Sequence, residues 1–142
     1  YRQFNKRLMN SLTPKPRKVY YSLILIQICL LIISLSCFYV GSVRLYLGAP
    51  NLSQSIDNSL RFYASGFIAI GFLAIWVATT VKRQNNLIFF FAFFVLMSGL
   101  GRLISIIDVG LPNNTYLFYL SIEFLLPLIM IITQIYLNKN IQ

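Results

Sequence analysis

Long apolar stretches alternate with short polar ones along this chain. A bilayer core of about 30 Å is crossed by about 20 mostly apolar residues in a helix. Four stretches are long enough: residues 19–43, 62–81, 87–107 and 115–137. We expect helices and not strands, because lipid offers no partner to unpaired backbone groups and the alternation of a barrel strand is absent. The pattern therefore predicts four transmembrane helices.

The polar links between these stretches predict how the helices are connected. Residues 82–86 and 108–114 are short links, and only the link at 44–61 is longer. Short links place consecutive helices side by side and antiparallel. The predicted fold class is all-α, a transmembrane four-helix bundle with antiparallel up-down-up-down topology. Its parts are a basic tail (1–18), the four-helix domain (19–137) and a short C-terminal tail (138–142).

Composition agrees with a membrane protein. Only 11% of the 142 residues are charged and 58% are hydrophobic, whereas soluble domains average about 25% and about 45–50%. The sequence contains no histidine, which excludes His-based zinc or haem ligation and a Ser-His-Asp triad. We therefore expect no metal or other cofactor, and no enzyme activity.

The net charge of +9 is unevenly distributed, and its distribution predicts orientation. Six of the twelve basic residues lie within residues 1–18, and Lys82, Arg83 and Lys139 lie at the same predicted face. By the positive-inside rule, both termini are cytoplasmic, and the links near Asp57 and Asp108 face outward. Because most basic residues flank apolar stretches, we expect the lipid bilayer and not nucleic acid as the partner. Two partners are open for the basic tail: anionic lipid and an acidic patch on a protein partner.

Polar side chains recur on one face of three of the predicted helices. Charges inside a membrane are costly and usually face other helices. Helical spacing forms three stripes: Asp57, Arg61 and Ser65; Ser98, Arg102 and Ser105; and Tyr116, Tyr119, Glu123 and Pro127. The candidate site consists of Asp57, Asn58, Arg61, Ser98, Arg102, Ser105 and Glu123. From their depths we expect the three stripes to converge in the outer half of the bundle, with Arg102 in contact with Glu123.

Two interpretations of these residues are open. In the structural one, Arg102–Glu123 is a buried pair that sets helix register, and Asp57–Arg61 is a capping pair at a helix start. In the functional one, Arg102 holds an anionic head group in a pocket that faces the outer leaflet. A catalytic role is not expected, since a carboxylate beside a guanidinium is a poor general acid.

Several short motifs resemble those of the domain-of-unknown-function 4345 family over about residues 20–137. The motifs are Asn58-x-x-Arg61-Phe62 followed by Ser65 in place of the usual glycine and then Gly66, Gly99 to Ser105, Gly110-x-Pro112, and Glu123-x-x-x-Pro127. This resemblance implies a small, four-spanning protein of a bacterial inner or thylakoid-type membrane. It implies no known activity.

Two functions from different classes remain. The first is an accessory, assembly or scaffold subunit of a larger membrane protein complex, because the chain is small and has no evident catalytic group. The alternative is a lipid- or isoprenoid-binding or -modifying protein that uses the outer-leaflet pocket around Arg61, Arg102 and Glu123.

Overall fold

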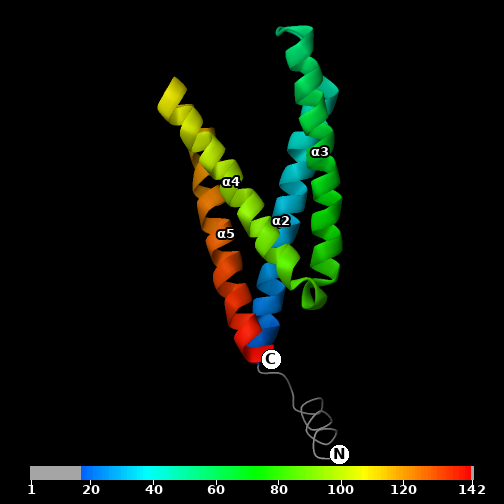
Figure 1. Cartoon of the computed structure of the whole chain (residues 1–142), viewed down its shortest axis with the longest axis vertical. Helices are drawn as coiled ribbons and strands as arrows, with labels where there is room; N and C mark the ends of the chain where they lie inside the picture. Colours follow the sequence, from blue (N-terminus) through cyan, green and yellow to red (C-terminus); the bar gives the residue numbers. More distant parts are fainter. Residues whose placement is uncertain (1–16, 142) are drawn as a thin grey trace, which may run out of the picture.

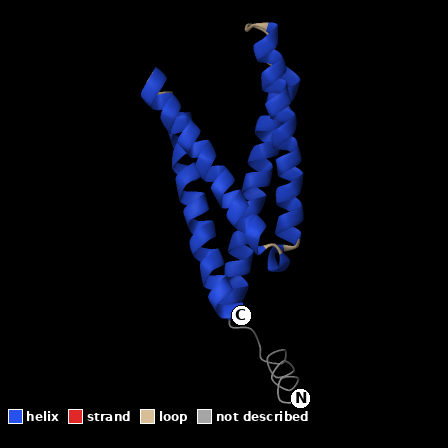
Figure 2. Cartoon of the chain, in the orientation of Figure 1, coloured by secondary structure: helices blue, strands red, loops and turns tan. Residues whose placement is uncertain are grey.

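Four long helices make up the protein in the computed structural model, which describes residues 17–141 (Figure 1). They are α2 (Arg17–Leu47), α3 (Gln54–Thr79), α4 (Asn85–Val109) and α5 (Asn114–Ile141), with a 3₁₀ turn, η1 (Val81–Arg83), between α3 and α4. The described part contains no strand (Figure 2). All four helices are long and apolar enough to cross a membrane. This confirms an all-α fold with four candidate spans, and most of the predicted basic tail lies outside the described residues.

The helices extend beyond the predicted spans, and local backbone chemistry sets their ends. Gly48 follows α2 with a φ of +58°, and its N–H donates to the Arg44 carbonyl at 2.9 Å. Gly110 follows α4 with a φ of +107° and donates to the Ile106 carbonyl at 3.0 Å. Glycine adopts these left-handed conformations without a Cβ penalty. The polar residues 54–61, expected to precede the second span, form the first two turns of α3.

The helices are arranged as two pairs that diverge from one end. Figure 1 shows α2 beside α3 and α4 beside α5, with the pairs closest where α2 begins and α5 ends. Contacts are extensive within each pair, fewer between α2 and α5, and sparse between α3 and α4. Helices joined by a short link were expected to pack side by side. This is the case for α4 and α5, but α3 and α4 make few contacts.

The buried core lies at the end where the pairs converge. It combines the N-terminal half of α2 with the C-terminal half of α3, the N-terminal half of α4 and the C-terminal half of α5. The completely buried members are Ile26, Leu30, Ala74, Val77, Ile88, Phe91, Ala92 and Met130. Towards the opposite end the side chains are far more exposed; Tyr46, for example, is 86% exposed. The core therefore joins the two pairs at one end and leaves the other end open.

Close backbone approach and buried hydrogen bonds hold α2 against α3. A Cβ added to Gly41 would lie 2.8 Å from the carbonyl oxygen of Ala64, so only glycine allows this separation. The Ser34 hydroxyl donates to the Gly71 carbonyl at 3.0 Å, and both residues are buried. Small residues and interhelical hydrogen bonds of this kind stabilise helix pairs in membranes, where the hydrophobic effect between helices is absent.

Candidate functional site

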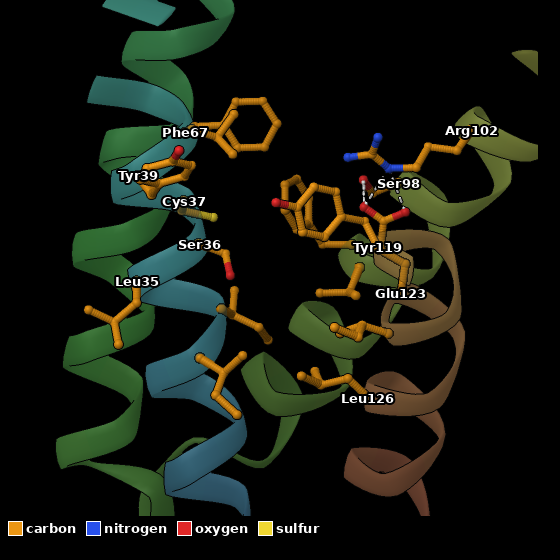
Figure 3. Close-up of a pocket in the computed structure, with 16 residues that line it drawn as sticks. Leu35, Ser36, Cys37, Tyr39, Phe67, Ser98, Arg102, Tyr119, Glu123 and Leu126 are labelled. Carbon is orange, nitrogen blue, oxygen red and sulfur yellow. Dashed lines mark hydrogen bonds and ion pairs between the residues drawn. The ribbon is translucent and has the colours of Figure 1, made fainter. Parts of the chain in front are cut away.

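An ion pair joins α4 to α5 near the open end of the molecule. Arg102 Nε donates to both carboxylate oxygens of Glu123, at 2.9 Å to Oε1 and 2.8 Å to Oε2. Ser98, one helical turn before Arg102, donates its hydroxyl to Glu123 Oε1 at 3.1 Å. The predicted contact between Arg102 and Glu123 is confirmed, and Ser98 belongs to the same cluster (Figure 3).

Local sequence explains why the two helices come together at this point. A Cβ on Gly99 would lie 3.2 Å from the Cβ of Glu123, so a larger residue would push α5 away from α4. Gly101 has no atom within 4 Å of the equivalent position and contributes no close contact. One glycine therefore sets the separation, while Ser98 and Arg102 lie one turn apart on the same helix face.

The Arg102 guanidinium is only partly used by the ion pair. Its central carbon lies 5.7 Å from the ring centroid of Tyr116 and 5.8 Å from that of Tyr119, within cation–π range. Among residues 17–141, only Nε of this guanidinium has hydrogen-bond partners. In Figure 3 the two Nη atoms point away from α4, towards the α2–α3 wall. Four N–H donors therefore remain available at this edge of the side chain.

These donors adjoin a cavity between the two helix pairs. Its volume is about 440 Å³, and all four helices contribute to its lining. Ligand pockets typically enclose about 300–1,000 Å³. Arg102, Ser98 and Glu123 line one part of the cavity, and most of the remaining wall is apolar, including Ile32, Leu35, Phe67, Phe94, Val95, Ile122 and Leu126. The site is therefore a largely apolar cleft with one charged cluster in its wall.

The second predicted pair, Asp57–Arg61, lies elsewhere and closes the turn between α2 and α3. Asp57 Oδ2 accepts from Arg61 Nε at 2.8 Å, and Asp57 Oδ1 accepts from the Ala49 N–H at 2.6 Å. Arg61 Nη1 donates to the Leu45 carbonyl at 2.6 Å. A Cβ on Gly48 would overlap both Asp57 and Arg61. This arrangement fits the structural interpretation, because every contact serves the helix end and its turn.

The expected convergence of the three polar stripes does not occur. The first turns of α3 and the last turns of α4 lie at the separated ends of different helix pairs (Figure 1). Asn58 and Ser105 are exposed, and the structure shows no side-chain hydrogen bond for either. The Ser65 hydroxyl donates to the Phe62 carbonyl within its own helix. The structure thus unites Ser98, Arg102 and Glu123 and separates them from Asp57, Asn58, Arg61 and Ser105.

Sequence reasoning missed two contributions. Ser36, Cys37 and Tyr39 of α2 line the cleft opposite the ion pair, and no charge in the first span drew attention to this face. A polar network at the closed end was also missed: Gln134 donates to Asn85 at 2.7 Å and to Asn138 at 3.1 Å. The sequence did contain a signal for this network, because Gln134 lies within an apolar stretch and a buried amide needs hydrogen-bond partners.

No metal centre is evident within residues 17–141, where no group of three or more potential ligands (Cys, Asp or Glu) lies together.

Comparison with known protein families identifies a match over most of the chain. A family model described as a domain of unknown function (DUF4345) matches residues 25–134. No curated protein and no solved structure matches the chain. The matched range includes the Arg102–Glu123 cluster and the residues that line the cleft.

Proposed function

The chain belongs to the family of the domain of unknown function DUF4345, and we propose that it is a membrane lipid-binding protein. In this proposal the cleft between the helix pairs receives the chain of an amphipathic lipid, and Arg102 binds its polar head. The observation that supports it is the set of unpaired Nη donors beside a mainly apolar cavity of about 440 Å³. An apolar pocket with a few convergent polar groups is the usual form of a small-molecule site.

The proposed topology places this site at a suitable depth. We propose that the helices cross the membrane in alternating directions with both termini in the cytoplasm, as the basic residues favour. Arg102 precedes the end of α4 at Val109 by seven residues, or about 10 Å along the helix. The 25 residues of α4 rise about 38 Å, which exceeds the ~30 Å core by a few ångströms at each end. Arg102 would then lie close to the head groups of the outer leaflet.

The proposal assigns binding and not catalysis to the cluster. Both oxygens of Glu123 accept hydrogen bonds from Arg102, and one accepts a third from Ser98. These hydrogen bonds hold the carboxylate against α4 as the partner of the guanidinium and of the Ser98 hydroxyl. A free guanidinium edge, in contrast, is suited to holding an anion.

The test is lipid retention after purification in mild detergent, measured by native mass spectrometry. The wild-type protein is expected to carry a bound lipid, and Arg102→Met is expected to lose it. Arg61→Met is the matched control, because Arg61 also pairs with a carboxylate but lies at the α2–α3 turn. Equal retention by the wild type and Arg102→Met would contradict the proposal.

A second candidate function is an accessory, assembly or scaffold subunit of a larger membrane complex. The sparse contact between α3 and α4 favours it, because each of these helices keeps an apolar face uncovered by the other. Phe72, Trp76 and Phe90 are at least half exposed and would contact either lipid or a partner's helix. Migration only as a free monomer in native gels of solubilised membranes would refute this candidate.

A further inference from the structure

We infer that the lipid is a single-chain amphiphile with a planar, singly charged head: a long-chain carboxylic acid in its ionised form. This inference rests on the proposed function and specifies the ligand class for the same cleft. It follows from three properties of the site, namely the geometry of the free donors, the charge balance and the volume available to the chain.

The geometry of the guanidinium selects an in-plane partner. Nε is occupied by Glu123, and the rings of Tyr116 and Tyr119 lie within 6 Å of the guanidinium carbon. The two ring centroids are 6.3 Å apart, so both rings lie on one side of the guanidinium, and the N–H donors that remain free lie in its plane at the Nη edge. Two parallel N–H groups at that edge match the two oxygens of a carboxylate.

The charge balance favours one negative charge and not two. Arg102 and Glu123 are the only charged residues among those that line the cavity, and they are already paired at 2.8 Å. A singly charged head leaves the site with a net charge of −1. A doubly charged phosphate would give the site a net charge of −2. Next to an apolar wall, the additional charge is expensive to desolvate.

The volume of the cleft suits one hydrocarbon chain. A methylene group is close in size to a water molecule, whose share of liquid volume is about 30 Å³. At about 30 Å³ each, roughly 15 methylene groups correspond to the 440 Å³ of the cleft. The cleft is partly open, so the second chain of a two-chain lipid would lie outside it, in the bilayer. The apolar residues of the wall, among them Leu35, Phe94 and Leu126, provide the surface against which one chain packs.

The experiment measures binding of four ligands to the protein and to its Arg102→Met, Arg102→Lys and Arg61→Lys variants in nanodiscs of phosphatidylcholine. The ligands are hexadecanoate, hexadecanol, hexadecyl phosphate and a two-chain phosphatidylglycerol. Hexadecanoate is expected to bind about tenfold more tightly than hexadecanol, which corresponds to one charge-assisted contact. Arg102→Lys keeps the charge but not the two-pronged geometry, and is expected to remove most of that preference. Arg61→Lys is the control and is expected to preserve it.

The possible outcomes separate this inference from the proposed function. Tightest binding of hexadecyl phosphate would overturn the single charge, and tightest binding of phosphatidylglycerol would overturn the single chain. In either case a loss of affinity in Arg102→Met would still support a lipid site. Binding of all four ligands that is unaffected by Arg102→Met would overturn both the inference and the proposed function.

Discussion

Removal of Glu123 should cost more stability than removal of both members of its ion pair. Glu123→Leu leaves the Arg102 guanidinium without its carboxylate and Ser98 without its acceptor. Arg102→Met together with Glu123→Leu removes the stranded charge and replaces it with an apolar side chain of similar length. The single variant is therefore expected to be the less stable of the two.

The structure bounds the size of this effect. Breaking a fully buried ion pair from one side costs about 3–5 kcal/mol. Here the side chains of Arg102 and Glu123 are 35% and 15% exposed, so solvent or head groups screen part of the charge. Interhelical hydrogen bonds measured in a membrane protein average about 0.6 kcal/mol, with a maximum of about 1.7 kcal/mol. We expect a loss of about 1–2 kcal/mol for Glu123→Leu and about 0.5 kcal/mol for the double variant.

The assay is reversible unfolding in mixed micelles with increasing sodium dodecyl sulfate, for the wild type, both single variants and the double variant. The coupling energy between Arg102 and Glu123 is the sum of the two single-variant losses minus the loss of the double variant. From the values above it is about 0.5–1.5 kcal/mol plus the loss caused by Arg102→Met alone. Asp57→Asn combined with Arg102→Met is the control, and its effects should add to within about 0.5 kcal/mol, because the two residues share no partner. A double variant as unstable as the sum of its singles would refute the argument that this pair is energetically coupled.

Three further predictions follow from other parts of the structure. Gly48→Ala should lower the free energy of unfolding by at least about 1–2 kcal/mol, because its φ of +58° is left-handed and the added Cβ would also displace Asp57 and Arg61. The methyl group added in Gly101→Ala meets no atom, so this variant should leave the free energy of unfolding unchanged or raise it. Equal losses for Gly48→Ala and Gly101→Ala would contradict the special role of Gly48. Ser34→Ala should cost about 0.5–1 kcal/mol in the same assay through loss of its hydrogen bond to the Gly71 carbonyl, and a neutral result would show that bond to be dispensable. For topology, a maleimide that cannot cross membranes should label Asn51→Cys on intact cells and Gln84→Cys only after permeabilisation; the reverse pattern would invert the proposed orientation.

The sequence alone was sufficient to predict the helices and one long-range contact. Apolar stretches of about 20 residues leave helix as the only stable backbone in lipid, so all four spans were predictable without tertiary information. The contact between Arg102 and Glu123 was predictable as well. A short link makes α4 and α5 neighbours, and the two charges lie at similar distances from that link. Because an unpaired charge is costly at that depth, the contact was the favoured arrangement.

Only the tertiary structure decided where the helix pairs separate and which polar residues share a site. Helical periodicity indicates which residues share a helix face, but it does not determine the angle between two helix pairs. The two pairs are in contact through the buried core at the closed end, which includes Phe91 and Met130. The resulting divergence separates Arg61 from Arg102, and Arg61 instead pairs with Asp57 and the Leu45 carbonyl at its own turn. The same divergence forms the cleft beside Arg102, because the four helices pack fully at only one end of the molecule.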